Sequence, residues 1–392
     1  MKTIPADSDF HKAPKAWSQI KHQILGNYLA LFLGKLGLTG RPVYFVDGFA
    51  GPGRLEDGSE GSPLLAAKQA AAPRQKSRAG LLHCINVEAV ASTFANLEQV
   101  TAPYVRDGQV VNFHGRFEDL LPQILKRIGD ATAFFFIDPF GTKGAEIETL
   151  KCIAGRTGKS EVLVRYDDTR VKRLISWAAN NLEHFDESHR KTAQRMKARV
   201  DQLTDEEAAS HTELELLFET EVETRDWLIA GYERQVKAQT KFTYSLSYPI
   251  RNPLTGGHRY YLVHFCSHPD GYTHMANFMA QAERTYRKLA SGTGDLFRTG
   301  QEQMEFLVIH KEFAEKEELE LVGAIRERLP GIIKARRWHG KTVENRELYA
   351  AIVECFGWKV IRGEYIKAFR ELEKAGKIRM AGTNDNEYTH FA

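Results

Sequence analysis

The chain has 392 residues and carries 54 Lys and Arg against 51 Asp and Glu, so its formal net charge is +3. Hydrophobic residues make up 42% of the chain and charged residues 27%, a balance that is typical of globular proteins and excludes a disordered chain. This length predicts two or three domains. No apolar run approaches the roughly 20 residues of a membrane span, and the polar first residues lack a signal-peptide core. We therefore expect a cytoplasmic protein that is not bound to membranes.

The spacing of cysteines and histidines argues against a metal centre. Cys84, Cys152, Cys266 and Cys355 lie far apart, without a Cys-x-x-Cys pair. The histidines are scattered, and none shows metal-ligand spacing on a common helix. We therefore expect reduced thiols, and neither a zinc site nor an iron–sulfur cluster built by this chain.

Apolar strands alternate with helical patterns between residues 43 and 166. The strands are expected at 43–46, 81–88, 109–114, 132–137 and 161–166. Such alternation predicts an α/β fold with a doubly wound, Rossmann-like parallel sheet. The strands are apolar almost throughout, as expected when helices cover both faces. Two further strands, at 241–249 and 259–267, are expected to form a terminal antiparallel pair.

The pattern predicts four parts. A Rossmann-like core would comprise residues 1–170 and 240–290, and a charge-rich helical insertion or cap would occupy 171–239. A helical connector would span 291–330. Residues 331–392 carry 12 Lys and Arg against 8 Asp and Glu, and two amphipathic helices precede a hairpin. That order is typical of a winged helix-turn-helix domain.

Basic residues of this last part are candidates for nucleic-acid contact. The second amphipathic helix, at 362–375, would be the recognition helix. Phosphate contacts are expected from Arg336, Arg337, Lys341, Arg362, Lys367, Arg370 and Lys374. A winged helix used for protein contact is the alternative interpretation.

A glycine-rich turn directly after the first strand carries the strongest functional signal. Residues 47–53 read Asp-Gly-Phe-Ala-Gly-Pro-Gly, which is not the Gly-x-Gly-x-x-Gly of dinucleotide-binding folds. Glycines at this place let the backbone approach a ligand, beside the free N–H groups that begin a helix. The turn resembles motif I of S-adenosylmethionine-dependent methyltransferases. The resemblance places the cofactor against Asp47, Gly48, Phe49, Ala50, Gly51 and Gly53; a tight turn with no ligand is the alternative.

Acidic residues after the second and third strands would complete a cofactor site. Glu88 ends the second strand, where an acid in a nucleotide-binding sheet accepts hydrogen bonds from ribose hydroxyls. Glu118 and Asp119 follow the third strand, where a carboxylate would meet the adenine amino group. The helix dipole also favours acids in the first turn of a helix, with no ligand involved.

The fourth strand ends in Asp138-Pro139-Phe140-Gly141. This run resembles the Asp-Pro-Pro-Tyr/Phe motif of amino-methyltransferases, in which the aspartate accepts hydrogen bonds from the target amine. The chain departs from the motif, because Phe140 stands in the place of the second proline and Gly141 in that of the aromatic residue. We expect Asp138, Pro139 and Phe140 to position the acceptor, while the departure leaves nitrogen methylation and catalysis itself open.

Several segments together resemble the three-Cys-motif partner (TcmP) proteins. The segments are YFVDGFAGPG at 44–53, GSP at 61–63, INVE at 85–88, FFFIDPFG at 134–141 and YYLVHFCSHPDG at 260–271. The resemblance covers nearly the whole chain. It implies a methyltransferase-like core with a C-terminal winged helix. It also implies association with a separate three-cysteine protein of the iron–sulfur, radical type.

The leading hypothesis is an S-adenosylmethionine-dependent methyltransferase that acts on nucleic acid, DNA or RNA, together with that partner. Methyl transfer is an in-line displacement, for which a protein supplies orientation and a dry pocket. One alternative is a non-catalytic adaptor whose methyltransferase-like core docks the partner. A weaker alternative is a defence or mobile-element nuclease, for which the sequence shows no two-metal carboxylate cluster.

Overall fold

The computed structural model describes residues 16–36, 39–55, 58–72, 82–139, 144–168, 221–253, 255–290 and 300–391. Contacts divide the chain into two compact units. The first comprises residues 1–251 and 258–267, and the second comprises residues 252–257 and 268–392. None of the described helices is long and apolar enough to cross a membrane.

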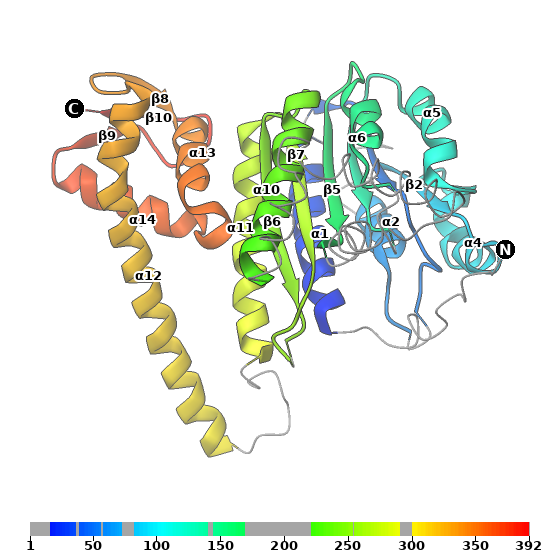
Figure 1. Cartoon of the computed structure of the whole chain (residues 1–392), viewed down its shortest axis with the longest axis horizontal. Helices are drawn as coiled ribbons and strands as arrows, with labels where there is room; N and C mark the ends of the chain where they lie inside the picture. Colours follow the sequence, from blue (N-terminus) through cyan, green and yellow to red (C-terminus); the bar gives the residue numbers. More distant parts are fainter. Residues whose placement is uncertain are drawn as a thin grey trace, which may run out of the picture. The chain divides into compact units, whose positions relative to one another are not determined.

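A seven-stranded sheet forms the centre of the first unit (Figure 1), in the order β3-β2-β1-β4-β5-β7-β6. The strands are β1 (Val43–Asp47), β2 (Leu82–Glu88), β3 (Val110–His114), β4 (Thr132–Ile137), β5 (Ser160–Tyr166), β6 (Tyr244–Arg251) and β7 (His258–Cys266). Strands β1 to β5 are parallel, and β7 is antiparallel to both β5 and β6. The predicted parallel sheet with a terminal antiparallel pair is therefore confirmed.

Helices cover both faces of this sheet, which explains why β4 (Thr-Ala-Phe-Phe-Phe-Ile) is apolar along its length. The helices are α1 (Ala16–Leu36), α2 (Ser62–Ala71), α4 (Ala91–Arg106), α5 (Phe117–Ile128), α6 (Ile147–Ala154) and α10 (Glu221–Gln239). Phe135 belongs to a core that includes residues of α5, α6 and α10. Phe134 points to the opposite face, where its ring centroid lies 5.2 Å from that of Tyr28 on α1. Alternate side chains of one strand thus fill two cores.

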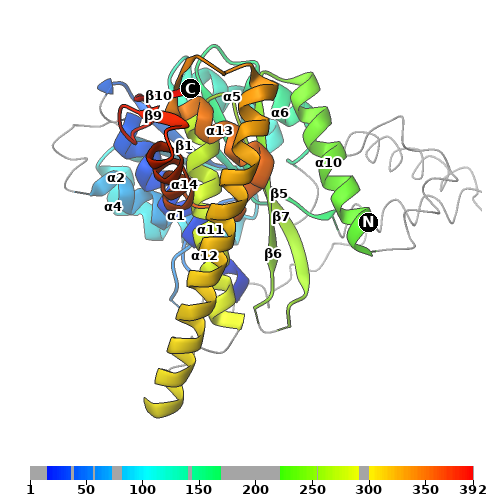
Figure 2. The same ribbon diagram turned by 90° about the vertical axis from the view of Figure 1, so that its left-hand side faces the viewer.

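The second unit combines four helices with a small sheet. Its elements are α11 (Pro269–Ala290), α12 (Gly300–Arg336), β8 (Thr342–Glu344), α13 (Asn345–Phe356), the 3-10 turn η4 (Gly357–Lys359), α14 (Arg362–Lys374), β9 (Ile378–Met380) and β10 (Tyr388–Phe391). The three strands are antiparallel, in the order β8-β10-β9. Figure 2 shows α12 as one long helix. The core of the unit includes Leu329, Tyr349 and Phe369, which come from α12, α13 and α14.

The predicted boundaries need two corrections. Residues 268–290 were expected in the Rossmann-like core but belong to the second unit, where Asn277 of α11 accepts a hydrogen bond from the Arg362 backbone N–H at 3.0 Å. The expected boundary between a connector at 291–330 and a separate domain at 331–392 falls inside α12, which is continuous. Of the predicted insertion at 171–239, only α10 is described, and residues 171–220 lie outside the described residues.

Candidate functional site

The sheet order reverses between β1 and β4, and the candidate site lies at the carboxyl ends of these two strands. In open α/β sheets, ligands bind in the crevice at such a switch point. Asp47 is the last residue of β1 and pairs in register with Phe136 of β4. The Gly48 backbone N–H donates a hydrogen bond to the Phe136 carbonyl at 2.9 Å. The structure therefore brings the glycine-rich turn and the Asp138 segment to the same edge of the sheet.

Backbone hydrogen bonds tie the turn at 47–53 to the end of β2. The Ala50 N–H donates to the Val87 carbonyl at 2.9 Å, and the Gly51 N–H donates to Glu88 Oε2 at 3.0 Å. Gly51 has φ +66° and Gly53 has φ +75°, which favour glycine. A Cβ on Gly53 would lie 2.7 Å from Val100 Cγ2, whereas a Cβ on Gly51 would meet no described atom within 4 Å. The turn is thus tightly packed at Gly53, whereas no described atom fills the place of a Cβ at the buried Gly51.

Glu88 anchors this turn, a role that the sequence reasoning missed. Its Oε2 accepts from Gly51, and its Oε1 accepts the Val90 backbone N–H at 2.7 Å. A carboxylate offers about four lone-pair sites, and these two backbone groups use two of them. The predicted ribose contact and the observed anchoring are therefore compatible.

Phe49 of the same turn packs inward. Its ring centroid lies 5.9 Å from that of Phe117, the first residue of α5. A Cβ on Gly48 would lie 3.1 Å from the Phe117 ring, and one on Gly144 would lie 2.7 Å from the Phe49 ring. Close packing therefore explains why glycines stand at 48 and 144. The Phe49 ring, packed against Phe117, fixes the turn to α5.

Asp47 is fully buried. Burial raises the pKa of Asp47 to about 7, although the Ser62 hydroxyl and the Phe49 backbone N–H act to lower it. The Phe49 N–H donates to Asp47 Oδ1 at 3.2 Å. Asp47 Oδ2 accepts no hydrogen bond of normal geometry from the described residues. The buried carboxyl group therefore holds one oxygen that the described residues leave without a hydrogen bond of normal geometry.

Asp138 lies between two cations that the sequence reasoning missed. Lys21 of α1 donates a hydrogen bond to Asp138 Oδ2, and Arg165 Nη1 of β5 lies 3.7 Å from Asp138 Oδ1. Arg165 also lies 3.6 Å from Asp167 Oδ2 and stacks over the Tyr260 ring at 4.2 Å. Burial acts to raise the pKa of Asp138, but the charges of Lys21 and Arg165 outweigh it and hold that pKa below its usual value. Asp138 is therefore an ionised, doubly paired carboxylate.

The remaining predicted catalytic residues are only partly described. Pro139 is buried directly after Asp138, whereas Phe140 and Gly141 lie outside the described residues. His22, next to Lys21, has a pKa lowered to about 3 by burial and by the Lys21 charge. A neutral imidazole therefore accompanies the ionised Lys21–Asp138 pair at neutral pH.

Glu118 and Asp119 stand in the first turn of α5, as predicted. Both carboxylates lie 3.9 Å from Arg116 Nε, and the Asp119 side chain is 75% exposed. Such exposed pairs add little stability. The structure places these acids beyond the third strand, and an adenine contact from them stays a prediction.

A second acidic group lies further along the same edge. Asp168 follows β5 and is buried; its Oδ1 lies 2.6 Å from His258 Nε2, at the start of β7. The sequence signal was present, because Asp167 and Asp168 directly follow an apolar strand, as Asp47 and Asp138 do. The partner His258 was not predictable from it, since 90 residues separate the pair.

The predicted nucleic-acid residues of the second unit fall into two groups. Arg362 is turned inward: it pairs with Asp385, donates to the Thr383 carbonyl at 2.7 Å and lies over the Tyr349 ring at 4.9 Å. It was expected to contact phosphate, but its guanidinium instead holds the turn between β9 and β10. The exposed group consists of Arg336, Arg337, Lys341, Lys367, Arg370 and Lys374. Within it, Arg336 pairs with Glu354 and Lys367 with Glu318.

No family model and no curated protein matches this chain. Solved structures do resemble it. A Legionella pneumophila protein of the DUF519 family matches with a TM-score of 0.41 and 12% identity, over 70% of this chain and 93% of its own.

Two of the solved structures are O-methyltransferases with a bound ligand. TomG from Streptomyces achromogenes, in complex with SAM, has a TM-score of 0.33 and 14% identity over 67% of this chain and 93% of its own. An O-methyltransferase from Bacillus cereus, in complex with SAH, has a TM-score of 0.32 and 11% identity over 62% and 80%. At these values the likenesses assign neither a family nor a reaction to this chain.

Proposed function

We propose that this chain is an S-adenosylmethionine-dependent methyltransferase that acts on nucleic acid. The observation that carries the proposal is the turn at 47–53, which lies at the switch point of the sheet and where no described atom fills the place of a Cβ at Gly51. The resemblance of this turn to motif I supports S-adenosylmethionine over a dinucleotide. The strand order, with β7 antiparallel between β5 and β6, agrees with the methyltransferase-like core that the resemblance implies.

The residues at the crevice fit the cofactor. Asp47 Oδ2 is a buried acceptor suited to the amino group of the methionine end. Glu88 has lone pairs left for the ribose hydroxyls, and Glu118 or Asp119 would accept from the adenine amino group. When bound, the cofactor supplies an activated methyl group. The protein's part is to hold the acceptor in line with it and to keep water out.

Asp138 would orient the acceptor, together with Pro139 and Phe140. An amine donating to an ionised carboxylate keeps its lone pair pointing away from that carboxylate, toward the methyl group. Arg165 and Lys21 keep Asp138 ionised. The acceptor amine would therefore replace Lys21 on Oδ2, while Arg165 stays as the positioning partner of Oδ1.

The C-terminal elements support a nucleic-acid acceptor. Helices α13 and α14, joined by the short η4 turn, are followed by the β9–β10 hairpin, to which β8 adds a third strand. We infer that residues 342–391 act as a winged helix-turn-helix module. Arg370 and Lys374 of α14 are exposed, and no carboxylate of the described residues forms an ion pair with either of them within 4 Å. Both are therefore suited to phosphate contact.

Binding of the cofactor is the decisive test. Calorimetry should show S-adenosylmethionine binding with a Kd of the order of micromolar, about −8 kcal/mol. Glu88→Gln should weaken it, and Glu98→Gln, an exposed glutamate of α4, should not. Because Glu88 also anchors the turn, S-adenosylhomocysteine and its 2′,3′-dideoxy analogue should be compared in both proteins. A ribose contact predicts that the affinity gap between these ligands shrinks in Glu88→Gln.

One observation favours the alternative that the chain is a non-catalytic adaptor. Lys21 already occupies the oxygen of Asp138 that an acceptor amine would need. An adaptor would bind the three-cysteine protein, which the family resemblance proposes as a partner, and would transfer no methyl group. Co-expression with such a protein, followed by purification and a radiolabelled methyl-transfer assay on DNA and RNA, separates the two. Co-purification without transfer to either nucleic acid would favour the adaptor.

A further inference from the structure

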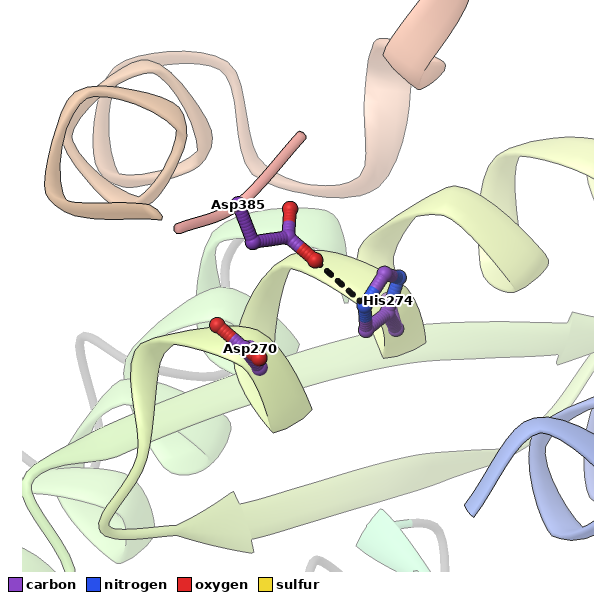
Figure 3. A group of neighbouring side chains, drawn as sticks. All are labelled: Asp270, His274 and Asp385. Carbon is purple, nitrogen blue, oxygen red and sulfur yellow. Dashed lines mark ion pairs between the residues drawn. The ribbon is translucent and has the colours of Figure 1, made fainter. Parts of the chain in front are cut away.

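Three potential metal ligands gather in the second unit, outside the site described above. They are Asp270 and His274 of α11 and Asp385 of the turn between β9 and β10 (Figure 3). One donor atom from each lies within 4.8 Å of the donor atoms of the other two. Asp270 and His274 share a helix face because four residues separate them, whereas Asp385 comes from a segment more than 100 residues further along. No metal site was expected from the sequence, because its cysteines and histidines are scattered.

The spacing of His274 and Asp385 suits a small divalent ion, and Asp270 offers a third donor within 4.8 Å. His274 Nε2 lies 3.3 Å from Asp385 Oδ2, and Figure 3 shows these two groups facing one another. Two ligands of a tetrahedral ion with bonds of about 2.0–2.1 Å lie roughly 3.3 Å apart. The side chains of the three residues are 12–20% exposed, so the cluster is sheltered but still reached by water.

Neighbouring arginines lie beside both carboxylates of the cluster. Arg362 binds Asp385 through Oδ1, which is the oxygen turned away from His274. A charged hydrogen bond to the outer oxygen of a ligating carboxylate is a common supporting contact at metal sites. Arg346 Nη1 lies 3.9 Å from Asp270 Oδ1, but Arg346 Nε lies closer to Glu344, at 3.0 Å. The charge of Arg346 is therefore shared with a second carboxylate outside the cluster.

We propose that Asp270, His274 and Asp385 bind a divalent transition-metal ion, zinc before other metals, with water completing the coordination. One imidazole and two carboxylates form a donor set that suits zinc. The ion would clamp the β9–β10 turn onto α11. This turn belongs to the hairpin of the module assigned above to nucleic acid, yet the metal site does not depend on that assignment. The competing outcome is a network of ion pairs that binds no metal.

The test uses the full chain after removal of metals with EDTA. Cys152 and Cys355 are exposed thiols that would compete for zinc, so both are replaced by serine in every protein compared. Calorimetry with zinc chloride should show one site with a Kd of about 1 μM or tighter, and the melting temperature should rise on adding zinc. His274→Gln should weaken binding at least tenfold. His339→Gln, an exposed histidine outside the cluster, should leave binding unchanged.

A spectroscopic readout separates a lost ligand from a lost fold. Cobalt(II) added to the metal-free protein should produce the visible absorption of a tetrahedral site, which His274→Gln should abolish while its circular dichroism stays that of the parent. The proposal is wrong if zinc binds His274→Gln as tightly as the parent. It is equally wrong if the parent binds no zinc at about 1 mM, a concentration that would detect even a weak site.

Discussion

Lys21 donates a hydrogen bond to Asp138, joining α1 to the end of β4 across 117 residues. The side chains are 12% and 13% exposed, so both charges are largely removed from water. Burial acts to lower the pKa of Lys21, but the charge of Asp138 outweighs it and the pKa is raised. The pair is therefore ionised at neutral pH. Asp138 neutralises the charge of Lys21, and Lys21 together with Arg165 neutralises the charge of Asp138.

Removing one partner of this pair should be costly to stability. Lys21→Met leaves Asp138 with Arg165 alone, and we expect a loss of about 2–4 kcal/mol in the free energy of unfolding. The double variant Lys21→Met/Asp138→Asn should lose less than the sum of the single variants, by about 1–3 kcal/mol. Urea unfolding measures all three proteins, with Lys126→Met, an exposed lysine of α5, as the control. Additive losses would show that the two residues are not coupled.

The proposed methyl transfer also requires the negative charge of Asp138. Asp138→Asn keeps the shape of the side chain but removes the charge that would hold the acceptor amine. We expect kcat to fall at least ~100-fold, while S-adenosylmethionine affinity changes by less than about twofold. Calorimetry and a single-turnover transfer assay measure the two effects independently. Unchanged transfer would remove Asp138 from the mechanism, even with cofactor binding intact.

Gly53 provides a test of the turn that needs no ligand. Alanine there meets both an unfavourable φ of +75° and Val100 Cγ2 at 2.7 Å. Gly108 has φ +73°, and a Cβ added there would meet no described atom within 4 Å, so Gly108→Ala should cost only about 1–2 kcal/mol from the backbone. Gly53→Ala should cost that amount plus about 1–3 kcal/mol of overpacking. Adding Val100→Ala should recover part of the second contribution, as thermal or urea unfolding will show.

The elements that could be predicted from the sequence are those with a local signal. The strands are short apolar runs bounded by polar turns, and Asp47, Glu88 and Asp138 each lie at or directly after the end of one of them. The parallel sheet then brings those three residues to one edge, because carboxyl ends of parallel strands coincide. Local pattern and topology together were enough for this part of the candidate site.

The features that could not be predicted from the sequence depend on contacts between segments that are distant along the chain. Nothing near Lys21 in the sequence marks it as a partner of Asp138, since its helix shows only an apolar period. Arg362 looks like a surface residue of an amphipathic helix, and its inward position depends on Asp385, 23 residues later. The assignment of α11 to the second unit likewise depends on its contacts with later helices, such as the pair of Arg284 with Glu364 on α14.

Stability should depend on pH through Asp47. Its pKa is about 7 in the folded protein and 3.8 in an ordinary aspartate, so the folded state holds the proton more tightly. Protonated Asp47 therefore adds up to roughly 4 kcal/mol to the free energy of unfolding. This contribution is fully present below about pH 4 and is lost as the pH rises through about 7. The lowered pKa of Asp138 acts only below the usual aspartate range, but the pKa of His22, lowered from 6.5 to about 3, makes stability rise with pH in the same window. The contribution of Asp47 is therefore measured as a difference between the parent and a variant of this residue.

Asp47→Asn should remove this pH dependence, because an amide does not titrate. The free energies of unfolding of the parent and the variant, measured in urea from pH 4 to pH 8, should converge or cross as pH rises. The parent should lose stability relative to Asp47→Asn across that interval. A constant difference between the two proteins would mean that the pKa of Asp47 is not raised.

Nucleic-acid affinity should separate the exposed basic residues from the inward one. Arg370 and Lys374 lie four residues apart on α14, and both are exposed. Replacing either with alanine should weaken binding of duplex DNA or structured RNA at low salt. Each replacement should also reduce the slope of log K against log salt by about 1. Because neither side chain belongs to the core of the second unit, the melting temperature should stay within about 2 °C.

Arg362→Ala should behave differently, because its guanidinium holds the turn through Asp385 and Thr383. Leaving Asp385 without this partner should lower the melting temperature by several degrees, as expected for a loss of about 2–3 kcal/mol. Arg127→Ala, an exposed arginine of α5, serves as the control for loss of charge alone. If the salt slope falls equally for Arg127, Arg370 and Lys374, the binding follows net charge. A fall confined to the α14 pair assigns the contact to that helix.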